Sequence, residues 1–190
     1  MAIVEAKSSY TPEDLLTLPD GDHYELVDGN LVERHMGAVS SWTGGILYHF
    51  LQVHCQANNL GWVWPADNGY RCFPDAPGKV RRPDVSFIRR GRLPDEQLPT
   101  GYVRIAPDLA VEVLSPNDLA YEVDGKVLEY LRAGVRLVWV VNPESRTVRI
   151  HRADGSTGWL LEHAELSGEA VVPGFRCAVR ELFPPATRPE

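Results

Sequence analysis

Residues 107–116 read Pro-Asp-Leu-Ala-Val-Glu-Val-Leu-Ser-Pro, a segment that places one carboxylate, Glu112, within an apolar run bounded by prolines. Such a run predicts a central strand covered on both faces, where an unpaired carboxylate costs on the order of several kcal/mol. Glu112 therefore needs a partner such as an Arg, a Lys or a bound cation, and it is a candidate functional residue. The alternative is an edge strand on which Glu112 faces water.

A second acid lies at the start of a short apolar strand upstream. Residues 81–88 read Arg-Arg-Pro-Asp-Val-Ser-Phe-Ile, with Asp84 as the acid. Oxygen ligands from two carboxylates suit Mg²⁺ or Mn²⁺, whereas zinc favours His or Cys. Two carboxylates that face each other without a metal repel, so at least one carboxyl pKa should be raised. Because side chains alternate along a strand, Leu114 is expected on the face of Glu112.

The composition predicts an ordinary globular protein in the cytoplasm. The chain has 190 residues, 44% of them hydrophobic and 24% charged, which is typical of one domain with a sizeable core. We expect a flexible arm at residues 1–10, a single domain at 11–183 and a disordered tail at 184–190. No segment has the length of a membrane span, and the first residues lack the apolar core of a signal peptide. Three distant cysteines without a Cys-x-x-Cys pair predict reduced thiols.

The charge distribution leaves nucleic-acid binding open. A net charge of −7 argues against binding nucleic acid through bulk charge. Basic residues nevertheless cluster around the Asp84 strand, at Lys79, Arg81, Arg82, Arg89, Arg90 and Arg92. This cluster either contacts a nucleic-acid backbone or forms a solvated rim.

Caps and turns predict the N-terminal elements. Residues 11–16 begin with Thr-Pro-Glu-Asp, which indicates a capped short helix. Residues 24–33 are two alternating runs around Asp-Gly, which predict a hairpin with a type I′ turn. The simplest interpretation puts Glu25 and Glu33 on the solvated face of that hairpin.

Periodicity and turn residues predict the other elements. We expect helices at 40–58 and, after cap residues 115–118, up to Gly134; strands at 62–64, 69–73, 135–141, 147–150 and 159–161; and a closing segment at 171–183. The long loop at 91–106 is a candidate flap over a site. Lys126 and Tyr130 are four residues apart on the second helix and can meet on one face, although a solvated lysine is the default for any helix.

The order of short motifs resembles a known family. The motifs are Tyr-Glu-Leu-Val-Asp-Gly (24–29), Arg-Pro-Asp-Val (82–85), the 107–116 segment, Lys126 with Tyr130 and Gly134-Val135, Val-Trp-Val-Val-x-Pro (138–143), Pro-Gly-Phe (173–175) and Leu-Phe (182–183). Together they resemble the Uma-type family of “putative restriction endonucleases”, within the PD-(D/E)XK nuclease superfamily, across residues 11–183.

The resemblance implies an α/β fold, a restriction-endonuclease-like mixed β-sheet flanked by helices, with a site that uses Mg²⁺ or Mn²⁺ to hydrolyse phosphodiester bonds in DNA. Asp84 and Glu112 match the two acids of the family, and the carbonyl of Val113 is a further candidate metal ligand. Leu114 stands where the usual lysine would be, and the long side chain of Lys126 could bring an ammonium to that space. Glu25 is a further candidate catalytic acid.

The sequence also departs from the family. Relatives commonly carry a His near the start of the long helix, and residues 40–42 contain none. The predicted function is a metal-dependent DNA endonuclease, and the alternative is a catalytically inactive nuclease-fold module that binds DNA or a protein. The acidic net charge and the missing His favour the alternative, whereas the intact acids and Lys126 favour the enzyme. The sequence leaves open whether the chain forms a homodimer.

Overall fold

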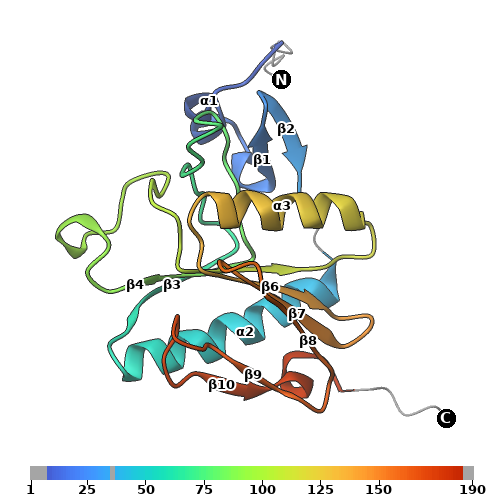
Figure 1. Ribbon diagram of the computed structural model, residues 1–190. Coiled ribbons are helices and arrows are strands. Elements are labelled where there is room, and N and C mark those ends of the chain that lie inside the picture. The colour runs from blue at the N-terminus through green and yellow to red at the C-terminus, as the bar shows by residue number, and fades with distance from the viewer. Residues whose placement is uncertain (1–7, 35–36, 186–190) are drawn as a thin grey trace.

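A six-stranded mixed sheet forms the centre of the molecule (Figure 1). The computed structural model describes residues 8–34 and 37–185, so parts of the predicted arm and tail lie outside the described residues. The strands, in spatial order, are β3 (Gly61–Pro65), β4 (Val85–Arg89), β5 (Leu109–Val113), β6 (Leu137–Asn142), β7 (Thr147–Arg152) and β8 (Thr157–Leu160). Only β5 and β6 are parallel neighbours. The fold class expected from the sequence is confirmed.

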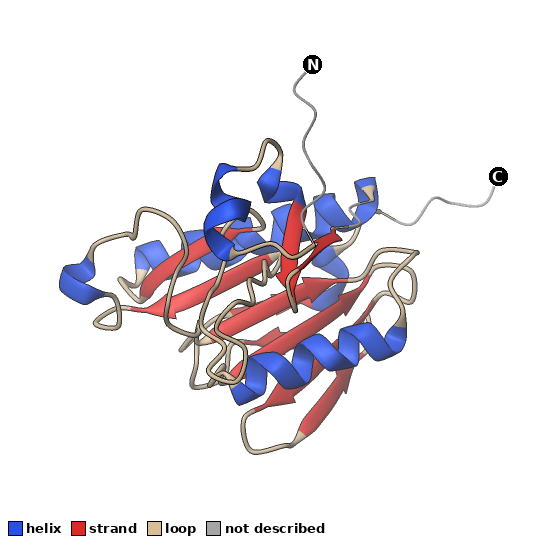
Figure 2. Ribbon diagram, turned by 90° about the horizontal axis from the view of Figure 1, so that it is seen from above, coloured by secondary structure: helices blue, strands red, loops and turns tan. Residues whose placement is uncertain are grey.

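One long helix packs on each face of the sheet. Helix α2 (Ala38–Ala57) covers one face, together with the short hairpin of β9 (Glu165–Ser167) and β10 (Arg176–Ala178). Helix α3 (Ala120–Arg132) lies over the strands on the other face, as Figure 2 shows. The sheet is therefore buried on both sides, and β5 is buried along its whole length.

The alternation of side chains on β5 decides which helix each residue meets. Val111 and Val113 pack into the core on the α2 side, and Ala110 packs into the core on the α3 side. Since Glu112 has the parity of Ala110, its carboxylate is directed toward α3. The sheet thus places a single acid among the apolar contacts of α3.

A small N-terminal layer lies beyond α3 (Figure 1). It contains helix α1 (Pro12–Thr17), which Thr11 and Asp14 cap reciprocally, and the hairpin of β1 (Tyr24–Val27) and β2 (Asn30–Glu33). The hairpin turns through Asp28 and Gly29, both with positive φ, as the type I′ prediction requires. Short 3₁₀ helices occur at Gly21–His23, Pro94–Glu96 and Val179–Leu182.

Two local predictions are wrong. Residues 69–73 form no strand, because Tyr70 makes only isolated bridges to Arg81 and Val103. Helix α3 begins at Ala120 behind Leu119, which gives it no side-chain cap. The expected cap residue Asp118 instead accepts a hydrogen bond from the Ser115 backbone at 2.6 Å, closing a turn before the helix.

The three cysteines form no disulfide, as the sequence predicted. Burial raises the pKa of Cys55, Cys72 and Cys177 to about 12, so the thiols stay protonated at neutral pH. Within the described parts of the chain, none of the helices combines the length and apolar character needed to cross a bilayer.

Candidate active site

A pocket of about 210 Å³ lies where the end of β5, helix α3 and the N-terminal hairpin meet. Its lining includes all five residues that the sequence nominated for the site: Glu25, Asp84, Glu112, Val113 and Lys126. These residues come from segments as far apart as residues 25 and 126, so only the tertiary fold brings them together. The predicted flap at 91–106 contributes no lining residue, so the expectation of a flap over this site is wrong.

Asp84 directly precedes β4 and is fixed by the backbone of β5. Its N–H donates to the carbonyl of Val111 at 2.9 Å. Its Oδ2 accepts a hydrogen bond from the N–H of Val113 at 2.7 Å. Among the described residues, its Oδ1 has only a long contact, 3.4 Å, with the guanidinium of Arg34. One carboxylate oxygen is thus tied to the sheet, and the other faces the pocket with one weak partner.

Glu112 is 7% exposed on a central strand, so the edge-strand alternative is wrong. The hydroxyl of Tyr130 donates to Oε1 at 2.7 Å, and the ammonium of Lys126 lies 3.4 Å from Oε2. Tyr130 itself is fully buried. Sequence reasoning noted that Tyr130 shares a helix face with Lys126 but assigned it no role. Its i+4 spacing from Lys126 was the signal that could have assigned one.

Lys126 lies between two acids and is not a solvated helix residue. Its Nζ is 3.2 Å from Oε2 of Glu25 and 3.4 Å from Oε2 of Glu112. Leu114 lines the same pocket. Lys126 on α3 and position 114, where the resemblance would place a lysine, therefore border the same space.

Glu25 is buried, at 1% exposure, which overturns its placement on a solvated hairpin face. Its Oε1 accepts a hydrogen bond from the backbone N–H of Arg82 at 2.8 Å. Its Oε2 lies 2.8 Å from Arg81 and also contacts Lys126. Because both oxygens are engaged, Glu25 is placed to position the lysine.

The basic cluster predicted around Asp84 is divided between two regions. Arg81 and Lys79 pair with the two oxygens of Glu129, at 2.8 and 2.5 Å. The guanidinium of Arg82 donates to backbone carbonyls. These three side chains are buried and paired, so they do not form a solvated rim. The arginines at 89–92 lie at the far end of β4.

Burial and mutual repulsion make the two acids hard to ionise. Burial, followed by the charge of Glu112, raises the pKa of Asp84 to about 7. Burial also raises the pKa of Glu112, although the nearby Lys126 opposes that shift. For Glu25, burial would raise the pKa, but Lys126 and Arg81 outweigh it and the net pKa is lowered. Burial would lower the pKa of Lys126, but the carboxylates raise it above its ordinary value, so Lys126 stays charged.

The donor set fits a hard divalent cation that keeps water ligands. Within residues 8–34 and 37–185, no group of three or more His, Cys, Asp or Glu side chains could hold a metal ion. Mg²⁺, however, is commonly bound by one or two carboxylates and several waters. In the described part of the chain, the only contacts of Asp84 Oδ1 and Glu112 Oε2 are with cations at 3.4 Å, so these two oxygens are the ones left for such an ion.

Residues 40–42, where relatives commonly carry a His, are used differently here. Ser40 is buried at the start of α2, and its hydroxyl lies 2.9 Å from that of Ser115. Gly44, one turn further along, comes close to Asp84, since a Cβ there would lie 3.9 Å from the Asp84 Cβ. The start of α2 thus abuts the site without offering it a titratable group from residues 40–42.

A mixed sheet between two helices, with two acids and a lysine gathered at one strand end, defines a nuclease-like α/β protein. The chain belongs to the Uma2 family, described as “Putative restriction endonuclease”, whose model matches residues 12–180. It is also similar to a crystal structure titled a “putative nuclease belonging to DUF820” from Anabaena variabilis, with a TM-score of 0.75 and 20% sequence identity. That match covers 91% of this chain and 97% of the other, and it shows a shared fold. No curated protein matches the chain.

Glu25→Ala is expected to destabilise the fold by about 3 kcal/mol, the lower end for breaking a buried ion pair, because it removes a buried carboxylate that both Arg81 and Lys126 contact and leaves Arg81 to Glu129 and Lys126 to Glu112. The matched control is Glu33→Ala on the same hairpin, where the exposed side chain predicts a change within about 0.5 kcal/mol. Urea denaturation of the metal-free proteins measures both. Equal stabilities for the two variants would contradict a structural role for Glu25.

Proposed function

We propose that the protein is a metal-dependent endonuclease that hydrolyses phosphodiester bonds in DNA. The observation that carries this proposal is the convergence of Asp84, Glu112 and Lys126 on one pocket, where the pKa of each acid is raised. Two buried carboxylates that repel each other cost the fold free energy, and a divalent cation between them would offset that cost. Catalytic sites often contain acids arranged in this way.

Asp84 and Glu112, with the carbonyl of Val113, would hold Mg²⁺ or Mn²⁺. The bound ion would polarise a phosphate oxygen and lower the pKa of a coordinated water. Tyr130 keeps one oxygen of Glu112 occupied by a hydrogen bond, so the other oxygen stays directed at the pocket. The backbone of Val113 fixes Asp84 in the same way. These two contacts pre-orient the ligands before any ion arrives.

Lys126 would act through its charge. Its raised pKa keeps the ammonium protonated at neutral pH, which favours orienting a water and offsetting charge on the phosphate over abstracting a proton. Glu25 positions that ammonium between the hairpin and β5. Glu25 would therefore contribute to the reaction through Lys126.

The size of the pocket favours a polymeric substrate. Pockets that enclose drug-sized molecules measure roughly 300–1,000 Å³, whereas this one measures about 210 Å³. Such a space suits one phosphate group of an extended chain together with its waters. The membership of the Uma2 family favours DNA as that chain.

Supercoiled plasmid is the sharpest substrate for a test, because it has no ends and any cleavage is endonucleolytic. We expect the protein to relax or linearise plasmid in millimolar Mn²⁺ or Mg²⁺. Cleavage should stop when EDTA is added, and the Asp84→Asn variant should be inactive. Isothermal titration should show heat of metal binding in the wild type and less in Asp84→Asn. No heat, no thermal shift and no cleavage at millimolar metal would favour an inactive nuclease-fold module instead.

A further inference from the structure

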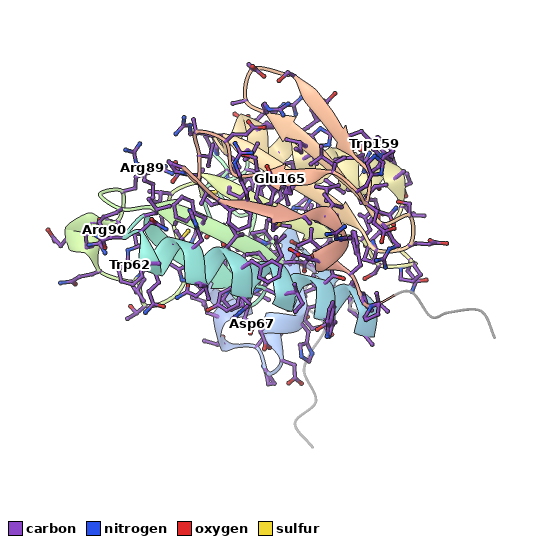
Figure 3. The ribbon with its side chains drawn as sticks, turned by 90° about the horizontal axis from the view of Figure 1, so that it is seen from below. Trp62, Asp67, Arg89, Arg90, Trp159 and Glu165 are labelled. Carbon is purple, nitrogen blue, oxygen red and sulfur yellow. The ribbon has the colours of Figure 1, made fainter. Side chains whose placement is uncertain are left out.

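A second group of basic side chains lies at the opposite end of the strands that carry the acids. Four arginines surround a shallow hollow there: Arg89, Arg90, Arg92 and Arg136. We call these residues the arginine quartet. Figure 3 shows Arg89 and Arg90 at the margin of the molecule, at the same end as Trp62.

Strand pairing explains why these distant residues meet. The register pairs Phe87 with Leu109, and Leu109 with Leu137, so the end of β4 lies beside the starts of β5 and β6. Arg89 closes β4, and Arg136 directly precedes β6. The residues that flank these three strand ends therefore lie side by side, at one end of the strands.

Asp108 organises the quartet from beneath. It is 3% exposed, and its Oδ2 accepts hydrogen bonds from the backbone of Arg89 at 2.8 Å and from the guanidinium of Arg92 at 2.7 Å. The carboxylate of Asp108 therefore holds the backbone at Arg89 and the side chain of Arg92. It does not pair with the guanidinium groups of the other three arginines. Within the described parts of the chain, Arg89, Arg90 and Arg136 are exposed and form no ion pair.

This excess of positive charge is unusual on a chain with a net charge of −7. At the other end of β4, the basic residues that precede Asp84 are buried against carboxylates or backbone carbonyls. Exposed guanidinium groups crowded around one hollow repel one another, and an anion with several oxygens would relieve that repulsion. Arginine forks match the oxygens of a phosphate group especially well.

We infer that the arginine quartet is a phosphate-contacting site for the backbone of a nucleic acid. This inference rests on the proposed function and names a second contact for the same polymer. The five residues of β5, from Leu109 to Val113, span about 16 Å of strand, which separates the quartet from the acids. That distance corresponds to roughly five base-pair steps of a duplex, so one short DNA segment could contact both regions.

The test compares two double variants that remove equal charge. Arg89→Gln with Arg136→Gln changes the quartet, and Arg176→Gln with Arg180→Gln changes two exposed arginines of the C-terminal segment. Binding of a fluorescent duplex of about 20 base pairs is followed by anisotropy in EDTA, where no cleavage occurs. We expect the quartet variant to bind ~10-fold or more weakly at 0.1 M salt, and the slope of log affinity against log salt to fall by about 1.8. The control should match the wild type.

Three other outcomes would each decide between the inference and the proposed function. Equal DNA affinity for both double variants overturns the inference, and plasmid cleavage by the wild type would then leave the proposed function intact. Loss of binding in the quartet variant, with a wild type that never cleaves plasmid, supports the inference and overturns the proposed enzyme. If inorganic phosphate raises the melting temperature of the wild type but not of the quartet variant, and the duplex does not bind, the ligand is a small phosphate compound and the inference is wrong.

Discussion

Glu112→Gln is expected to abolish metal-dependent cleavage and to raise the free energy of unfolding of the metal-free protein. The amide cannot supply the negative charge that a divalent cation requires, so the catalytic loss should be complete. The gain in stability follows from the raised pKa of Glu112, which means that folding disfavours the ionised carboxylate. Gln keeps the shape of the side chain and can still accept the hydrogen bond from Tyr130.

Plasmid cleavage in Mn²⁺ and urea denaturation in EDTA measure the two effects. Glu144→Gln makes the same chemical change at an exposed position after β6 and should alter neither quantity. The addition of Mg²⁺ should stabilise the wild type and leave Glu112→Gln unchanged. A metal-free Glu112→Gln protein less stable than the wild type would show that the ionised carboxylate stabilises the fold, against the electrostatic account of the site.

The pH dependence of stability supplies a second measurement of the same prediction. The folded protein binds the proton of Asp84 more tightly than the unfolded chain does, because its pKa rises from 3.8 to about 7. The contribution of Asp84 to the unfolding free energy of the metal-free protein should therefore fall as the pH rises from about 4 to about 7, by on the order of a few kcal/mol. In Glu112→Gln the fall should be smaller, since the charge that helps to raise the pKa of Asp84 is gone.

The central strand was predictable because its evidence is local. Residues 109–113 are apolar apart from Glu112, and a strand with such a pattern has few stable places other than the middle of a sheet. The same pattern also indicated which side chains share a face. The sequence could not show which helix covers that face or that Tyr130 would meet Glu112. These contacts depend on how the chain after β5 packs back onto the sheet.

Glu25 shows where an alternating pattern is ambiguous. Alternation separates the two faces of a hairpin, but it does not show whether the polar face meets water or another segment. Here Val80 pairs with Leu26, and the adjoining Arg81 covers the carboxylate of Glu25. A buried ion pair of this kind leaves a pattern identical to that of a solvated pair.

The basic cluster shows the opposite limit. Arginines on both sides of β4 are neighbours in the sequence, and the sequence therefore suggested one patch. A strand of five residues spans about 16 Å, so the residues before β4 and those after it lie at opposite ends of the strand. The residues before β4 are buried around Glu25 and Glu129, and those after it are exposed.

Lys126→Ala is expected to lower metal-dependent cleavage by at least ~100-fold, the lower range for one positioned charge, with metal binding largely retained. The reason is that Lys126 supplies the ammonium that borders the pocket from α3, where Leu114 leaves the strand position apolar. Lys126→Arg should recover only part of the activity, because a guanidinium fork occupies different space. The exposed Arg180→Ala variant controls for the loss of one positive charge.

Folding has to be checked beside activity, because Lys126 also faces two acids. Glu25 keeps Arg81 as a partner and Glu112 keeps Tyr130, so the variant should fold. Circular dichroism and the stabilisation by Mn²⁺ measure this directly. A rate in Lys126→Ala equal to that of an active wild type would leave the lysine with a structural role only.

Leu114→Lys on the Lys126→Ala background tests whether strand and helix positions converge on one site. Leu114 has the parity of Glu112 on β5 and lines the same pocket, so a lysine there can return an ammonium to the space that Lys126 occupied. We expect cleavage of plasmid in Mn²⁺ to recover in the double variant. Leu114→Lys alone would place two ammonium groups near the same acids, and their repulsion should keep its rate below that of the wild type. No recovery in a double variant that still folds and binds Mn²⁺ would mean that the reaction needs the ammonium in the position that α3 and Glu25 give it.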